Sequence, residues 1–219
     1  MIAMLIAAAI SAAPVTALDA ERAFAAEAQA KGQWTAFRHW ADPTAVMFEP
    51  QAVWVQQALK GRADPPRSVA WAPAQSFVSC DGRTAVNGGA WTIPGSSVRG
   101  SFTTVWVRRP DGAWRWAVDS GGPEGATPLP RSARTIRASC ADRGAAARMF
   151  AATTAATASL ERPPGDAGQG RSADGTLTYQ WTVSPAGQRT FVAKLWNGRI
   201  YRTVIERRYA APAAAKPRP

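Results

Sequence analysis

Few side chains in this 219-residue sequence are suited to catalysis, and the single histidine is the first to consider. His39 stands three residues before Asp42, whose carboxylate could orient the imidazole for acid–base work. No Gly-x-Ser-x-Gly stretch accompanies it, and neither cysteine has the flanking residues of a catalytic thiol. We therefore favour the simpler interpretation of His39, a helix-end histidine that bonds a carbonyl.

Two carboxylates end predicted strands and are the other candidates for acid–base chemistry. Glu49 follows the apolar residues Met47 and Phe48 and precedes Pro50, and Asp119 closes a hairpin. At the mouth of a pocket, such a carboxylate can acquire a raised pKa and act as a base. In the simpler interpretation, which we favour, Glu49 is a solvated strand-end carboxylate and Asp119 caps its strand.

The two cysteines, Cys80 and Cys140, bear on both the compartment and metal binding. Cysteines of exported proteins often pair, but the sequence leaves open whether these two lie within bonding distance. The chain has neither a Cys-x-x-Cys motif nor a pair of histidines, so the usual ligands of a metal site are missing. We expect no metal and no cofactor.

Residues 1–17 are uncharged and mostly apolar, which is typical of a secretory signal peptide. The apolar run 2–13 is too short to span a bilayer as a helix, so no stable membrane insertion is expected. Residues 15–17 are small enough for a signal peptidase. The sequence thus predicts cleavage before Leu18 and a periplasmic or secreted protein, the alternative being an uncleaved amphiphilic N-terminus.

The net charge of +11 at pH 7 arises from 26 lysines and arginines against 15 aspartates and glutamates. A charge of this size would suit nucleic acid or an anionic surface. The basic residues are scattered, however, without a run of five. We therefore expect a basic exported protein that does not bind nucleic acid.

The elements that must position the candidate residues begin with helices. Ala20, Phe24 and Ala28 form an apolar stripe at helical spacing, and Glu21 falls outside it. From residue 75 onward, turn residues separate successive strands, and helices followed by four antiparallel strands indicate an α+β domain. The predicted order is a helix at 16–31, a helix at 33–40, a strand at 45–48, a helix at 53–59, and strands at 75–80, 83–93, 98–109 and 114–120.

The rest of the chain has weaker patterns. We expect a strand at 135–140, a loop at 163–174 and a meander of about three strands at 177–183, 190–196 and 200–207, with 141–159 open between helix and loop. The predicted units are a signal peptide at 1–17, an α+β domain at 18–122, a linker at 123–134, a C-terminal β extension at 135–208 and a disordered tail at 209–219.

Residues 18–120 resemble the nuclear transport factor 2-like superfamily, specifically its SnoaL-like branch. The resemblance is carried by ERAFAAEAQAKGQWTAFRHWADPTAVMFEP and by the hairpin that ends in TTVWVRRPDGAWRWAVDSG. It implies a cone-shaped, curved antiparallel sheet that wraps around the helices and leaves a pocket, a cystatin-like fold. Residues 131–219 match no family pattern.

Ketosteroid isomerases share the implied fold and use a carboxylate base with two donors to the developing oxyanion. The resemblance places Glu49 at the position of the base. It places Phe24, which has no hydroxyl, near the tyrosine donor and Thr104 near the second donor. Without those donors the developing negative charge lacks stabilisation, so we lean away from an enzyme.

The aromatic residues of the predicted cone could line an apolar ligand cavity or form its packed core. We expect the lining of any cavity to be Phe37, Phe48, Trp91, Phe102, Trp106 and Trp116, with Thr104 and Glu49 as its few polar points. Three hypotheses follow: an exported module that binds a small apolar molecule or serves as an accessory module, an isomerase or dehydratase that uses Glu49, His39 or Asp119, and a structural homodimer. A convergent set of polar groups inside the cone would favour the enzyme.

Overall fold

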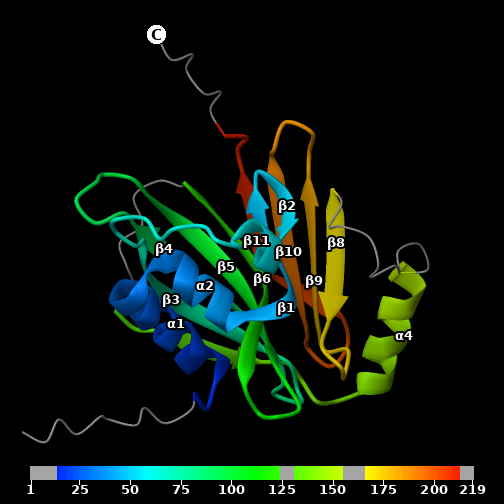
Figure 1. The fold of residues 1–219 in the computed structure, drawn as a ribbon. Helices are drawn as coiled ribbons and strands as arrows, with labels where there is room; N and C mark the ends of the chain where they lie inside the picture. The colour runs from blue at the N-terminus through cyan, green and yellow to red at the C-terminus, as the bar shows by residue number, and fades with distance from the viewer. Residues whose placement is uncertain (1–13, 124–130, 155–165, 213–219) are drawn as a thin grey trace, which may run out of the picture.

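The computed structural model describes residues 14–123, 131–154 and 166–212, and it arranges them mainly in three layers (Figure 1). Helices cover one face of a seven-stranded sheet, and a four-stranded sheet packs against its other face. The helices are α1 (Ala17–Lys31), α2 (Gln33–Trp40), α3 (Val55–Ala58) and α4 (Arg143–Thr154). No helix in these ranges is both long and apolar enough to cross a membrane.

The larger sheet has the order β2-β1-β6-β5-β4-β3-β7, and the smaller has the order β11-β10-β9-β8. The strands of the larger sheet are β1 (Ala41–Glu49), β2 (Gln51–Trp54), β3 (Ala70–Val78), β4 (Thr84–Thr92), β5 (Arg99–Arg108), β6 (Trp114–Pro123) and β7 (Arg134–Arg137). Those of the smaller sheet are β8 (Ala167–Arg171), β9 (Leu177–Val183), β10 (Arg189–Trp196) and β11 (Tyr201–Tyr209).

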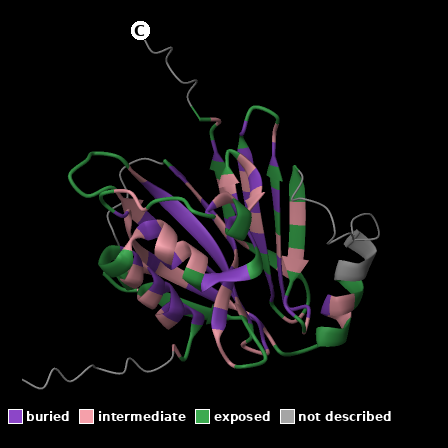
Figure 2. Ribbon diagram, in the orientation of Figure 1, coloured by how far each residue is buried: buried purple, intermediate pink, exposed green. Residues whose placement is uncertain are grey.

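Alternation along β5 divides the interior into two cores, because successive side chains of a strand point to opposite faces. Trp106 packs with Phe24 of α1 in the core beneath the helices. Its neighbour Val105 belongs to the core shared with the smaller sheet, which includes Trp181 and Phe191. Figure 2 shows the buried residues concentrated along the strands where these layers meet.

The predicted α+β class is confirmed, and so is the order of two helices, a strand that ends before Pro50 and a series of hairpins. The larger sheet is mixed rather than wholly antiparallel, because β1 pairs with β6 and β7 pairs with β3 in parallel. Strand β7 was expected to begin the C-terminal extension. It instead covers the edge of β3, where unpaired backbone groups would otherwise remain.

Residues 163–174 were expected to form a loop, yet β8 lies within them and makes the meander four-stranded. Its glycines explain the error, since they are poor strand formers when considered alone. A Cβ on Gly168 would lie 2.3 Å from the Trp181 ring, and one on Gly170 would lie 2.3 Å from the Tyr179 ring. The two aromatic rings of β9 therefore cover the glycines of β8, an arrangement visible only once the strands pair.

Two further expectations are refined at the boundaries. Residues 141–159, left open between helix and loop, contain α4, while the predicted helix at 53–59 becomes β2 followed by the single turn α3. The predicted tail begins inside β11, because Tyr209 ends that strand and is buried. Residues 1–13 of the expected signal peptide, 124–130 of the linker and 213–219 of the tail lie outside the described residues.

Cys80 and Cys140 form a disulfide with a Cα–Cα distance of 5.2 Å. Hydrogen bonds beside it tie the two sheets together. The backbone N–H of Cys80 donates to Thr176 Oγ1 at 2.8 Å, and that of Asp81 donates to Asp174 Oδ2 at 2.7 Å. The disulfide and these hydrogen bonds therefore stabilise the corner at which the larger sheet meets the C-terminal strands.

Candidate functional site

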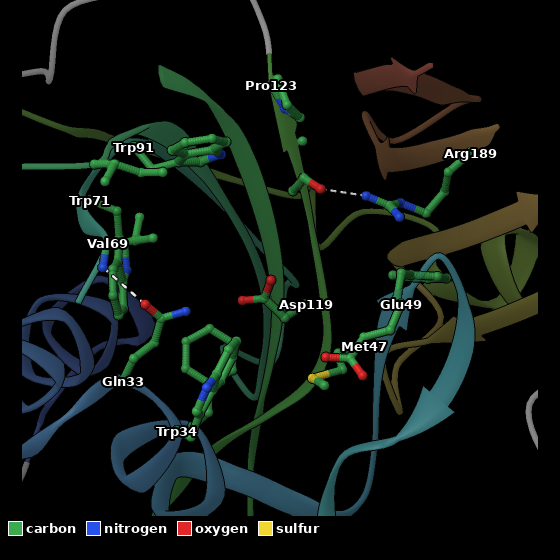
Figure 3. Close-up of a pocket in the computed structure, with 15 residues that line it drawn as sticks. Gln33, Trp34, Met47, Glu49, Val69, Trp71, Trp91, Asp119, Pro123 and Arg189 are labelled. Atoms are coloured by element: carbon green, nitrogen blue, oxygen red, sulfur yellow. Dashed lines mark hydrogen bonds between the residues drawn. The ribbon is translucent and has the colours of Figure 1, made fainter. Parts of the chain in front are cut away.

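A pocket of about 320 Å³ lies between α2 and the larger sheet, with its rim completed by the first residue of β10 (Figure 3). Its volume is at the lower end of the range of small-molecule sites. Its aromatic lining residues are Trp34, Phe37, Phe48, Trp71 and Trp91. Its other apolar lining residues are Met47, Val69, Ile93 and Pro123, beside Gly121 and Gly122. The four remaining lining residues, Gln33, Glu49, Asp119 and Arg189, are polar.

Asp64 fixes the start of α2, the helix that presents Gln33, Trp34 and Phe37 to the pocket. Its Oδ1 accepts the backbone N–H groups of Trp34 at 2.5 Å and Thr35 at 3.0 Å, so a distant residue caps the helix. Gly32 has φ +111°, and a Cβ there would lie 2.3 Å from Asp64 Cγ. A glycine before α2 is therefore required both by the backbone and by the capping carboxylate.

Gln33 presents a hydrogen-bond donor to the pocket. Its Oε1 accepts the backbone N–H of Val69 at 2.9 Å, which fixes the orientation of the amide. The Nε2 group then points toward the middle of the pocket and toward Asp119 (Figure 3).

Asp119 on β6 places a half-buried carboxyl group at the centre of the lining residues (Figure 3). Its pKa is raised to about 7, mainly by burial and then by the nearby carboxylate of Glu21, against the opposing effects of Thr104 and Arg189. Thr104 Oγ1 donates to Asp119 Oδ2 at 3.3 Å. At neutral pH, Asp119 can therefore either donate or accept a hydrogen bond.

Glu21 lies behind the pocket, fully buried on α1. It accepts hydrogen bonds from Trp71 Nε1 at 2.9 Å, Trp106 Nε1 at 2.6 Å and Asn87 Nδ2 at 3.2 Å. Burial raises its pKa, and these donors oppose the rise because they stabilise the carboxylate. Since Trp71 also lines the pocket, Glu21 holds one of its aromatic walls in place.

Glu49 at the end of β1 is the second carboxylate of the lining, and its side chain is about one-third exposed (35 %). It forms an ion pair with Arg62, whose guanidinium lies 4.5 Å from the centre of the Trp34 ring. The predicted strand-end carboxylate is thus at the pocket, with its charge balanced by a neighbouring arginine.

Arg189 comes from the C-terminal sheet and is only 7 % exposed. Its Nε donates to Ser120 Oγ at 3.1 Å and its Nη2 donates to the carbonyl oxygen of Gly121. Its guanidinium lies 4.5 Å from the Phe48 ring centre and 4.9 Å from that of Tyr209. The C-terminal sheet thus completes the pocket with a cation held between two aromatic rings.

Several residues predicted for the site lie elsewhere. His39 is exposed at the end of α2, where its Nδ1 lies 2.8 Å from Glu27 Oε2, away from the lining residues.

Phe102 and Thr104 are buried in β5 without lining the pocket. Trp106 and Trp116 are fully buried in the core beneath the helices, because their faces of β5 and β6 lie under α1. Of the predicted apolar lining, Phe37, Phe48 and Trp91 are at the pocket.

Three residues of the site were not predicted from the sequence: Glu21, Gln33 and Arg189. Glu21 had one available signal, since a chain with ten tryptophans needs buried acceptors for indole N–H groups. Gln33 stands at a helix start and Arg189 at a strand start, and neither position marks a residue as functional. Their shared pocket arises only when the two sheets pack.

Comparisons with known proteins return structural neighbours only. No family model matches the sequence, and no curated protein matches it. Among solved structures, a "putative ketosteroid isomerase" from Parabacteroides distasonis is 17% identical, with a TM-score of 0.41, over 50% of this chain and 89% of that chain. A nuclear transport factor 2-like superfamily protein from Salmonella enterica is 14% identical, with a TM-score of 0.38, over 52% and 93%.

A cystatin-like fold protein from Burkholderia xenovorans is 16% identical, with a TM-score of 0.34, over 49% of this chain and 84% of that chain. These neighbours match about half of the chain. Their names agree with the nuclear transport factor 2-like, cystatin-like resemblance found in the sequence. Because the similarity is low, the chemistry of the pocket has to be argued from the chain's own residues.

Proposed function

We propose that the pocket binds a small, largely apolar molecule that carries one polar group, with Asp119 as the anchor of that group. The observation that supports this most is the composition of the lining, in which five aromatic side chains surround one half-buried carboxyl group. Aromatic walls stabilise an apolar body by burial, and a few polar groups fix its orientation. An exported binding module is consistent with the disulfide between Cys80 and Cys140.

Titration with 2-naphthamide, an uncharged aromatic probe, tests this proposal by calorimetry. We expect saturable binding that weakens at least tenfold in Trp91→Ala, because the probe loses one aromatic wall. Trp54→Ala is the matched control, since Trp54 is half-buried but does not line the pocket. Absence of binding, or equal loss in both variants, would contradict the proposal.

A second candidate function, an isomerase, is favoured by one observation: Glu49 and Asp119 approach the same pocket from different strands. With a β,γ-unsaturated ketone bound, the Glu49 carboxylate would remove a proton from the carbon between the carbonyl and the alkene. Protonated Asp119 would donate a hydrogen bond to the carbonyl oxygen of the dienolate. Glu49 would then return the proton to the γ-carbon, which yields the conjugated ketone.

Conversion of 3-cyclohexen-1-one to 2-cyclohexen-1-one, followed by the absorbance of the conjugated product, tests the isomerase. We expect the rate to fall by about 100-fold or more in Glu49→Gln and in Asp119→Asn if these groups transfer and bind as described. A wild-type rate equal to that of buffer would reject an isomerase of small enones and leave the binding function in place.

The structural homodimer has less support. The face of the larger sheet opposite the helices is covered by the chain's own β9 and β10, which share a core with Val105 and Val118. That face is therefore not free to pair with a second copy.

A further inference from the structure

Arg189 and Gln33 face the pocket from opposite sides and add hydrogen-bond donors to it. We propose that the polar group recognised by this pocket is a carboxylate, so that the ligand is a small aromatic or aliphatic carboxylic acid. This inference rests on the proposed binding function and specifies its ligand class. Arg189 would supply the charge, with Gln33 and the protonated Asp119 as further donors.

The donor on Arg189 is identified by the contacts of its guanidinium group. Nε and Nη2 are bonded to Ser120 and Gly121, which leaves Nη1 without a hydrogen-bond partner among the described residues. Stacking against Phe48 and Tyr209 holds the guanidinium in place, so little side-chain freedom would be lost on binding. A buried guanidinium with an uncommitted N–H group is suited to a carboxylate oxygen.

The donor on Gln33 is fixed independently. Val69 occupies the amide oxygen, so Nε2 is the end of the side chain that faces the pocket. Nε2 also has no hydrogen-bond partner in the described part of the chain, although Gln33 is 9% exposed. Two elements that are distant in sequence, α2 and β10, thus each present one unused donor to the same small volume.

The acidic lining residues restrict the anion to a single charge. Because its pKa is raised to about 7, Asp119 has a protonated form at neutral pH that can donate to an oxygen of the ligand. The charge of Glu49 is balanced by Arg62. A dianion such as phosphate would meet both carboxyl groups with only one arginine in the lining, whereas a carboxylate needs only one opposing charge.

The experiment compares 2-naphthoate with 2-naphthamide, which share an aromatic body and differ in charge. At pH 6 we expect wild type to bind 2-naphthoate at least tenfold more tightly than 2-naphthamide. In Arg189→Gln this preference should fall to about one, because the loss of the positive charge weakens binding of 2-naphthoate much more than binding of uncharged 2-naphthamide. Arg202→Gln is the matched control, because it removes an exposed charge from β11 and should keep the preference.

Gln33→Glu gives a second test that leaves Arg189 intact. The substituted side chain keeps an acceptor for Val69 but places an anionic oxygen toward the pocket, so 2-naphthoate should bind at least tenfold more weakly. This variant decides the matter if Arg189→Gln does not give a native near-ultraviolet circular dichroism spectrum.

The pH dependence adds a readout on the unaltered protein. The charged or titratable neighbours of Asp119 are Glu21 from α1, Arg189 from β10 and, across the pocket, Glu49 from β1. As Asp119 ionises, it would repel the ligand, so 2-naphthoate affinity should fall about tenfold from pH 6 to pH 8.

Equal wild-type affinity for the two probes, or a preference that survives both Arg189→Gln and Gln33→Glu, would overturn the carboxylate inference and leave the binding function standing. Failure of both probes to bind would overturn the proposed function and this inference with it.

Discussion

Glu21 and Asp119, two carboxyl groups from α1 and β6, share the hydroxyl of Thr104 as a hydrogen-bonding neighbour. Glu21 lies in the core, and Asp119 lies at the pocket. The negative charge of Glu21 raises the pKa of Asp119, after the larger effect of burial. The core therefore influences the protonation of the pocket through a residue that does not line it.

Glu21→Gln should lower the pKa of Asp119 below about 7, because it removes the nearby negative charge and leaves burial as the main cause of the rise. Titration of the Asp119 side-chain carbon by NMR measures this shift. Glu27→Gln, on the same helix, is the control and should leave the pKa of Asp119 unchanged. An equal titration curve in wild type and Glu21→Gln would show that the two groups are not coupled.

The same substitution should reduce stability. Glu21 accepts three hydrogen bonds in the core, whereas glutamine offers one acceptor oxygen and turns an N–H group toward Trp106, Trp71 or Asn87. Leaving one buried donor without an acceptor costs about 1–3 kcal/mol of unfolding free energy. Urea denaturation measures the loss. A change smaller than that of exposed Glu206→Gln would contradict the role given to Glu21.

Asp119 should make the protein less stable as the pH rises. Its pKa is about 7 in the folded state against 3.8 ordinarily, so the folded state binds the proton more tightly. The free energy of unfolding then falls as the pH rises from about 4 through about 7, by at most roughly 4 kcal/mol from this group. Urea denaturation at pH 5 to 8 should show this fall in wild type and in exposed Asp166→Asn, and a smaller fall in Asp119→Asn.

The larger domain was predictable because its signals are local. The apolar spacing in α1 and the turn residues between the strands are patterns of residues that are close in sequence. The helix and the hairpins that these patterns predict are found in the structure. Strand β8 was missed because its glycines are stabilised by Tyr179 and Trp181, residues of another strand. Secondary structure that depends on a partner strand has no local signature.

The site was less predictable than the fold for the same reason. Trp106 and Trp91 occupy similar aromatic strand patterns in the sequence, yet one lies in the core and the other lines the pocket. Arg189 reaches the pocket only because the smaller sheet packs behind β6. The alternation of side chains along a strand predicts which residues share a face of the sheet. It does not predict which part of that face is covered by α1 and which part is left to line the pocket.

Removal of the disulfide should cost about 4 kcal/mol in the chain-entropy model, since 60 residues separate Cys80 from Cys140. Unfolding of wild type and of a Cys80→Ser, Cys140→Ser double variant in urea measures the difference. Thiol titration of the unfolded, unreduced wild type should detect no free thiol. Two free thiols in the purified protein would contradict the bond.

The position at which the predicted signal peptide is cleaved should also affect stability. Thr16 Oγ1 accepts the Asp19 backbone N–H at 3.1 Å, Asp19 Oδ2 accepts that of Thr16 at 3.2 Å, and the carbonyl oxygen of Ala17 accepts Asn87 Nδ2 at 2.9 Å. A chain beginning at Leu18, the predicted cleavage product, loses all three contacts. It should be about 1–2 kcal/mol less stable to urea than one beginning at Pro14.

Thr16→Ala in the longer chain should account for about 1 kcal/mol of that difference, because it removes only the cap. Mass spectrometry of the exported protein then determines which chain the cell produces. Equal stability of the two chains would show that the capping box and the Ala17 carbonyl contribute nothing to the fold. A product that retains Met1 would instead contradict the predicted export.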